Sequence, residues 1–137
     1  MKTRAELLAR LHELAPDGEA EDVGPWLELH PSLAALRETA VALADTCGCE
    51  FASLVVEIAG PDGSHVLRYF FYQPQDGVVV AIRLATAAGT TVPAISTHLH
   101  AAAWHEREIE DLFGIAFEGH PFLGDYVLHD SVWPEHV

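Results

Sequence analysis

The sequence predicts an α+β fold: an antiparallel β-meander of three to four strands, packed with helices on one side and followed by a charge-rich C-terminal helix and an irregular tail. Two observations lead to this prediction. Three segments with alternating apolar residues follow one another within residues 51–85, separated by short turns. Segments whose apolar residues recur three and four positions apart stand before and after them, as in helices that cover one face of a sheet.

The first element is expected to be a helix. Thr3 can cap its start, and Glu6, three residues later, completes a capping box. Residues 16–18, Pro-Asp-Gly, end it, and an acidic linker follows through Asp22. The apolar side of this helix consists of leucines at helical spacing: Leu7, Leu8, Leu11 and Leu14.

A short strand and a second helix come next. Residues 24–30 are expected to form an edge strand, because Pro25 has no N–H to donate and is excluded from the centre of a sheet. Pro31 then opens a helix from about Ser32 to Asp45. Its apolar stripe consists of Leu33, Leu36, Ala40, Leu43 and Ala44.

The three strands of the meander are expected at residues 51–59, 65–73 and 78–85, with turns at 61–64 and 74–77. The middle strand is rich in aromatic residues. Alternation places four residues of the first strand on one apolar face: Ala52, Leu54, Val56 and Ile58. The third strand has a corresponding face formed by Val78, Val80, Ile82 and Leu84.

The C-terminal helix is expected at residues 104–113, after a flexible connection at 87–91 and a short helix or turn that starts at Pro93. Gly114 stands where a left-handed C-cap is easiest for glycine. A helical period places five residues on one side: Ala102, His105, Ile109, Leu112 and Phe113. Two carboxylates, Glu106 and Glu110, fall on the opposite, exposed side, and Arg107 can pair with Asp111 one turn later. The tail is expected to contain one short strand at 126–128.

Length and composition predict a single domain over residues 1–137. Half of the residues are apolar, which argues against disorder. The 21 acidic and 7 basic residues give a formal charge of −14, which argues against nucleic acid or anionic lipid as a direct partner and favours partners with basic surfaces. No signal core and no apolar run of membrane-spanning length is visible, so we expect a cytoplasmic chain that contacts the membrane only through its partners.

The residues that could bind metal or carry out catalysis form no complete set. Cys47 and Cys49 are too close in sequence for an ordinary disulfide and too few for a zinc or iron–sulfur site. The histidines at 98, 100 and 105 match no zinc-helix motif, and the sequence has no nucleophile elbow, P-loop or dinucleotide fingerprint. We therefore expect no catalytic residue, no metal ligand and no cofactor-binding residue, which favours a binding or scaffold domain over an enzyme.

The C-terminal helix and the turn after it are the expected partner interface. An isolated run of charges is more often a solvated helix face, but here Trp104 borders the charges and the segment after the helix is aromatic and rich in turns. Exposed ion pairs contribute little to stability, so five charged side chains between 106 and 111 favour contact with another protein. The interface residues that we expect are Trp104, Glu106, Arg107, Glu108, Asp111, Phe113, Gly114, Gly119, His120 and Pro121.

This segment resembles the signature of the 30-kilodalton subunit of respiratory complex I and of its relatives in membrane-bound, energy-converting nickel–iron hydrogenases. The matching residues are Glu106-Arg107-Glu108, Asp111, Phe113-Gly114 and Gly119-His120-Pro121. The resemblance implies a non-catalytic scaffold subunit of the peripheral arm, without a cofactor of its own. Such a subunit braces the large subunit and the small iron–sulfur subunit on the cytoplasmic side of the membrane. The iron–sulfur clusters, and a nickel–iron or quinone site, belong to these partners.

Two departures leave open which complex the resemblance indicates. Complex I members usually have arginines after the Gly-His-Pro turn, whereas residues 122–125 here are Phe-Leu-Gly-Asp. Residues 127–130 and 133–135 look more like the hydrogenase-associated branch. An alternative function is a free-standing regulatory or small-molecule-binding domain that reuses the fold, and a metal-dependent hydrolase built on the histidines is the least favoured.

Overall fold

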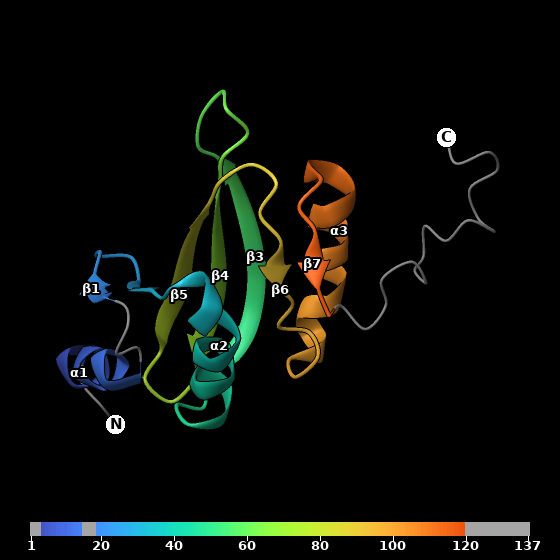
Figure 1. Cartoon of the computed structure of the whole chain (residues 1–137). Helices are drawn as coiled ribbons and strands as arrows, with labels where there is room; N and C mark the ends of the chain where they lie inside the picture. Colours follow the sequence, from blue (N-terminus) through green and yellow to red (C-terminus); the bar gives the residue numbers. More distant parts are fainter. Residues whose placement is uncertain (1–3, 15–18, 120–137) are drawn as a thin grey trace.

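A computed structural model of the protein describes residues 4–14 and 19–119 (Figure 1). The predicted Thr3 cap, the Pro-Asp-Gly turn at 16–18 and the tail strand at 126–128 lie outside these residues. The helices and strands in chain order are α1 (Arg4–Leu14), β1 (Glu19–Asp22), β2 (Leu27–His30), η1 (Leu33–Ala35), α2 (Leu36–Asp45), β3 (Glu50–Ile58), β4 (His65–Gln73), β5 (Val78–Thr86), β6 (Val92–Pro93), η2 (His100–Ala102), α3 (Ala103–Phe113) and β7 (Phe117–Glu118).

The predicted α+β fold is confirmed. The main sheet has the strand order β1-β2-β5-β4-β3. Strands β3, β4 and β5 form the expected antiparallel meander, and β2 joins it by pairing in parallel with β5. The sheet has five strands rather than three to four, because β1 pairs antiparallel with β2 and forms the edge.

The prediction that residues 24–30 form an edge strand is wrong. Strand β2 lies between β1 and β5 and pairs with both. Pro25 precedes the first strand residue, Leu27, so its missing N–H costs no ladder hydrogen bond. The segment predicted as an acidic linker supplies the edge instead, with only Ala20 of β1 buried. Charged side chains on a short edge strand discourage pairing with another chain.

The predicted apolar face of the first meander strand is correct at Leu54 but wrong at Ala52. A β-bulge between Phe51 and Ser53 inserts Ala52 as an extra residue into β3, and Ala52 is exposed. Phe51 turns to the core side instead and meets Phe71 edge-to-face, with ring centroids 5.7 Å apart.

The predicted apolar face of the third meander strand is confirmed. All four of its residues are buried in the core: Val78, Val80, Ile82 and Leu84. Strand β5 lies between β2 and β4, so this face is covered along its whole length.

All three helices pack on one face of the sheet, as predicted. A single core cluster joins buried residues of α1, α2 and α3 to those of the strands. The predicted helix at 32–45 begins with the short turn η1, in which the Ser32 side chain accepts a hydrogen bond from the Ala35 N–H at 3.2 Å. The helices contribute Leu7 and Leu11 from α1, Leu36, Ala40 and Leu43 from α2, and Ile109 from α3.

The short helix or turn predicted at Pro93 is a strand. Pro93 belongs to β6, which pairs in parallel with β7. The Val92 N–H donates to the Ala116 carbonyl at 2.9 Å, and the Ala94 N–H donates to the Glu118 carbonyl at 2.9 Å. These partners lie beyond α3 in the sequence, so local propensity did not reveal them.

Candidate partner interface

Helix α3 lies on the β3 side of the sheet and is reached through the turn η2 (Figure 1). Its buried side consists of Ala103, Glu106 and Ile109, together with Ala102 just before it. Gly114 ends the helix in the left-handed region, with φ of 70°, and its N–H donates to the Glu110 carbonyl at 3.0 Å. The predicted glycine C-cap is therefore confirmed.

The chain after the helix folds back along β6, and Arg37 of α2 holds this corner. The Arg37 guanidinium donates to the Ala94 carbonyl at 2.8 Å and to the Glu118 carbonyl at 3.2 Å. The Glu110 side chain accepts a hydrogen bond from the Phe117 N–H at 3.3 Å.

Gly119 ends the described part of this corner. Its φ of 81° is another conformation that favours glycine. His120 and Pro121, which complete the predicted interface, lie outside the described residues.

The prediction that Glu106 is exposed is wrong. Its side chain is completely buried, and its carboxylate accepts a hydrogen bond from the Ile95 N–H at 2.7 Å. Ile95 is completely buried as well. Glu106 thus fastens α3 to the segment between β6 and η2 and supports the interface from beneath. Charge-assisted hydrogen bonds of this kind are stronger than neutral ones.

The outward face of α3 combines large apolar side chains with carboxylates. Leu112 is 71% exposed and Trp104 is 49% exposed, and Glu108 stands between them one turn from each. Leu112 was expected on the buried side, together with Phe113. Phe113 is 39% exposed and touches the His65 ring at a centroid distance of 6.1 Å. We call Trp104, Glu108, Asp111 and Leu112 the α3 stripe.

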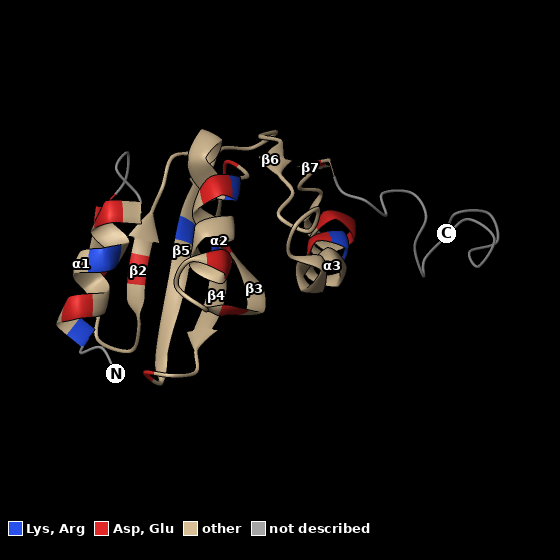
Figure 2. Cartoon of the chain, turned by 90° about the horizontal axis from the view of Figure 1, so that it is seen from below, with Lys and Arg blue, Asp and Glu red and all other residues tan. Residues whose placement is uncertain are grey.

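The predicted Arg107–Asp111 pair is confirmed. Arg107 Nε donates to Asp111 Oδ2 at 3.3 Å, and the Arg107 side chain is 12% exposed. Acidic and basic residues therefore lie side by side on this helix (Figure 2). Glu108 makes no ion pair within the described part of the chain. A carboxylate between two exposed apolar side chains is suited to a basic group on another protein.

A hollow of about 220 Å³ lies at the C-terminal end of α3. It is bordered on one side by Phe113, Gly114 and Ile115, and on the other by the turn residues that flank the meander. Those residues are Gly63, His65, Thr86, Ala87, Ala88, Gly89 and Thr90. Its position beside the exposed Leu112 makes it a suitable receptor for one side chain of a partner.

The cysteines and histidines that the sequence brought into question are separated in the structure. Cys47 and Cys49 are free thiols in the turn after α2. Burial, with a smaller contribution from Cys47 and Asp76, raises the pKa of Cys49 to about 12, so this thiol is unreactive at neutral pH. His98 bonds Asp45 at 3.0 Å, whereas the His105 ring lies against Phe51.

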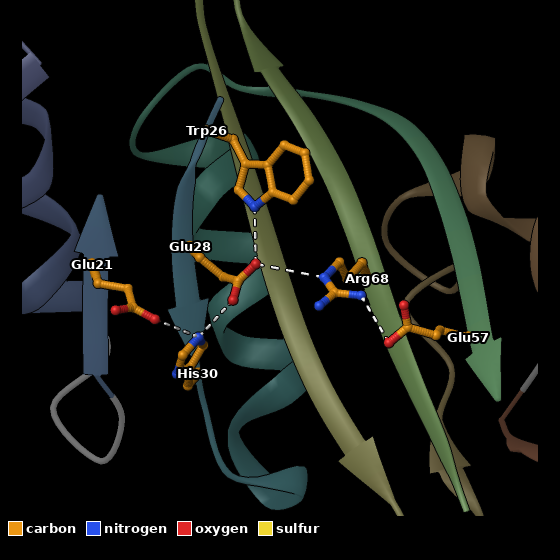
Figure 3. Close-up of polar contacts among 6 residues, drawn as sticks. All are labelled: Glu21, Trp26, Glu28, His30, Glu57 and Arg68. Atoms are coloured by element: carbon orange, nitrogen blue, oxygen red, sulfur yellow. Dashed lines mark hydrogen bonds and ion pairs between the residues drawn. The ribbon is translucent and has the colours of Figure 1, made fainter. Parts of the chain in front are cut away.

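One polar cluster that sequence reasoning missed lies on β1 and β2 (Figure 3). Ligand atoms of Glu21, Glu28 and His30 lie within 4.8 Å of one another. Glu28 already accepts a hydrogen bond from Trp26 Nε1 at 2.9 Å and is bonded to His30 at 2.8 Å. Arg68 lies 3.6 Å away and would repel a cation. The cluster is therefore a network of internal partners; its signal was the pairing of β1 with β2.

The pKa of Glu28 reflects this network. Burial raises the pKa, but hydrogen bonds from Trp26 and His30 and the charges of His30 and Arg68 outweigh burial and lower it. The carboxylate is therefore ionised at neutral pH, although only 6% of the residue is exposed. Separately, within residues 4–14 and 19–119 there is no helix with the length and apolar character needed to cross a bilayer.

Comparison with curated proteins gives several relatives. The C subunit of NADH-quinone oxidoreductase from Mesorhizobium japonicum is 32% identical over 102 residues, which are 71% of this chain and 50% of that protein. The C subunit from Paramagnetospirillum magneticum is 30% identical over 71% of this chain and 51% of its own length. The fused C/D subunit from Gluconacetobacter diazotrophicus is 36% identical over 74% of this chain and 18% of its own length. The chain spans about half the length of the first two relatives.

Two solved structures share the fold. A chain of the archaeal membrane-bound sulfane sulfur reductase, a respiratory membrane complex, superposes with a TM-score of 0.80 and 20% identity, covering 96% of this chain and 79% of that one. The trypsin-resistant fragment of Nqo5 gives a TM-score of 0.70 and 22% identity, covering 85% of this chain and 96% of that one. Residues 29–136 match the family model described as respiratory-chain NADH dehydrogenase, 30 Kd subunit. Since that match covers most of the sequence, the chain belongs to the family of the 30-kDa subunit of respiratory NADH dehydrogenase.

Proposed function

We propose that the chain is a non-catalytic scaffold subunit of a complex I-like oxidoreductase, either an NADH:quinone oxidoreductase or an energy-converting nickel–iron hydrogenase. Its role is to brace the large subunit and the neighbouring small iron–sulfur subunit. The observation that carries the proposal is the α3 stripe, whose large apolar and acidic side chains point outward from a helix that is itself fastened to the core. Family membership supports the proposal.

The exposure of the stripe gives it the capacity to bind. Burying an exposed Leu or aromatic side chain against a partner is worth about 1.5–3 kcal/mol. Leu112 and Trp104 are the two most exposed large apolar side chains of the helix. Interfaces concentrate their energy in a few such anchors, and aromatic residues are prominent among them. The buried Glu106–Ile95 hydrogen bond keeps the helix in place before the partner arrives, which reduces the entropy lost on binding.

The charge of the stripe indicates a basic complement on the large subunit. Glu108 has no cationic partner among the described residues, and the whole chain carries a formal charge of −14. A partner lysine or arginine placed between Trp104 and Leu112 would be desolvated on both sides. Such a contact is worth more than an exposed ion pair, which contributes about 0–1 kcal/mol.

Coexpression with the large subunit tests the interface. Glu108→Arg and Leu112→Asp are expected to leave melting near that of the parent chain and to reduce copurification of the large subunit at least tenfold. Glu13→Arg on α1 is the matched control, since Glu13 is also exposed. If both α3 variants fold and still copurify fully, the stripe is a solvated face and the interface assignment is wrong. Trp104→Ala, which introduces no charge, provides a third reading.

The absence of a cofactor from this chain is part of the same proposal. Elemental analysis and a visible absorption spectrum of the isolated chain are expected to show no stoichiometric metal or flavin. The clusters, and the nickel–iron or quinone site, are expected in the copurified subunits, whose metal content also distinguishes the two kinds of complex. Fractionation is expected to place the chain on the cytoplasmic side of the membrane only while the partner subunits are present.

A further inference from the structure

The sheet has a second face that no described helix covers. Because the helices pack on the side of Leu29, Ile82 and Tyr69, the alternate residues of the same strands point the other way. Val55 and Tyr72 on this side are 48% and 41% exposed. We call this surface the open face and define it by six residues on β3, β4, β5 and the approach to β2: Trp26, Val55, Arg68, Phe70, Tyr72 and Arg83.

Two arginines face each other at the centre of the open face. Arg68 and Arg83 are directly opposite partners in the antiparallel ladder of β4 and β5. Like charges in this position repel each other. A chain with only 7 basic residues has placed two of them side by side here. This arrangement requires a stabilising anion, either from the chain or from outside it.

The chain supplies that anion to only one of the two arginines. Arg68 lies 3.6 Å from Glu28 and 3.6 Å from Glu57, and these contacts are visible in Figure 3. Its buried Nε atom nevertheless has no hydrogen-bond acceptor. Arg83 is half-buried and makes no ion pair or hydrogen bond within the described part of the chain. Both guanidinium groups therefore have unused donor capacity at one point on the surface.

The surroundings of the arginine pair are apolar. Trp26 and Phe70 contact edge-to-face with centroids 4.9 Å apart. The Trp26 ring nitrogen is satisfied by Glu28, which leaves its ring available for contact. Aromatic side chains around a desolvated arginine are the usual composition of a protein–protein contact.

We propose that the open face is a second docking surface, on which a partner protein places an aspartate or glutamate carboxylate between Arg68 and Arg83. A carboxylate there can accept from both guanidinium groups and remove the like-charge opposition. The acidic residues Glu28 and Glu57 on the same face, and the net charge of the chain, argue against a polyanion or an anionic membrane. The proposal rests on the proposed function only in that the chain belongs to a complex; it concerns the face opposite α3.

Zero-length cross-linking tests the proposed contact directly. In the purified complex, Arg83→Lys introduces an amine that carbodiimide joins only to a carboxylate in contact with it. The expected product links residue 83 to an aspartate or glutamate of another subunit. Arg10→Lys, at an exposed position on α1, is the matched control and is expected to give at most a link to Glu13. A link from residue 83 only to Glu28 or Glu57 of the same chain, or no link, would overturn the proposal.

Charge reversal separates assembly from folding. Arg83→Glu replaces a repulsion across the ladder by an attraction to Arg68, so the isolated chain is expected to melt at the parental temperature or above it. The same variant is expected to reduce retention of one partner subunit at least tenfold, while Glu108→Arg reduces retention of the large subunit through α3. Full retention with Arg83→Glu overturns the open-face proposal and leaves the α3 interface standing. Binding of the parent chain to phosphatidylserine vesicles that is lost with Arg83→Glu would also overturn it, in favour of a lipid surface.

Discussion

Replacement of Glu106 tests whether this charge on α3 acts inside the domain or at its surface. The carboxylate is completely buried and accepts the Ile95 N–H at 2.7 Å. Glu106→Ala leaves that buried donor without a partner, which costs about 1–3 kcal/mol. It also removes two methylene-sized groups from the interior, worth about 0.8 kcal/mol each. Relief from burying a charge offsets part of this sum, and the expected loss is about 2–3 kcal/mol.

Two further variants make the interpretation specific. Glu106→Gln keeps an acceptor oxygen of similar shape, so its cost is expected to be about 1 kcal/mol, the difference between a charged and a neutral acceptor. Glu108→Ala, two residues along the same helix, removes an exposed carboxylate and is expected to stay within about 0.5 kcal/mol of the parent. The order of stability is therefore parent, Glu108→Ala, Glu106→Gln and Glu106→Ala.

Urea unfolding of the isolated chain, followed by circular dichroism, measures these differences. For a chain of this size, the loss expected for Glu106→Ala corresponds to a fall in Tm of roughly 10 °C. Burial of Tyr69, followed by the charge of Glu106, raises the pKa of the tyrosine well above its usual value, so both groups belong to the same buried region. If Glu106→Ala and Glu108→Ala are equally stable, the buried hydrogen bond contributes nothing and the reasoning is refuted.

Three further predictions concern stability, thiol reactivity and pH. Gly114→Val is expected to destabilise the chain by about 1–3 kcal/mol, because φ of 70° strains a β-branched residue although a Cβ there would meet no neighbour; an unchanged Tm would contradict this. At pH 8, iodoacetamide is expected to modify Cys47 in the folded chain but not Cys49, whose pKa is about 12, and mass spectrometry would detect a failure of this selectivity. Hydrogen bonds from Arg4 and from the Gly24 backbone lower the pKa of Asp22 to about 2, below its unfolded value. The contribution of Asp22 is therefore complete above about pH 4 and is lost as the pH falls through 2. Tm measured from pH 5 to pH 2 is expected to fall less for Asp22→Asn than for the parent, and equal slopes would contradict the assignment.

The meander could be predicted because its signals are local. Strands β4 and β5 each follow a clear turn, and the apolar residues of β5 alternate without interruption from Val78 to Leu84. The bulge at Ala52 could not be predicted in this way, since an extra residue changes the phase of alternation without changing composition. The same limit applies to β1, whose acidic residues have no strand propensity and become a strand only by pairing with β2.

The candidate site was predicted in position but not in detail. The sequence placed the interface on α3 and located its glycine cap, because capping and charge density are local properties. Helical periodicity alone did not determine which mixed face meets the core, so Glu106 was assigned outward and Leu112 inward. The partner of Glu106 is a backbone N–H of Ile95, and a backbone donor has no residue signature. The opposition of Arg68 and Arg83 needed the strand register.

The parallel pairing of β2 with β5 determines the order in which the domain can fold. Strands β3, β4 and β5 are neighbours in sequence and close short loops, so their pairing is fast. Leu27 pairs with Val80, far later in the chain, and that contact closes a long loop. During synthesis, α1, β1 and β2 leave the ribosome first but have no sheet to join until β5 has followed. The N-terminal third of the chain therefore waits with its leucines exposed, and it is the part of the molecule for which a chaperone matters most.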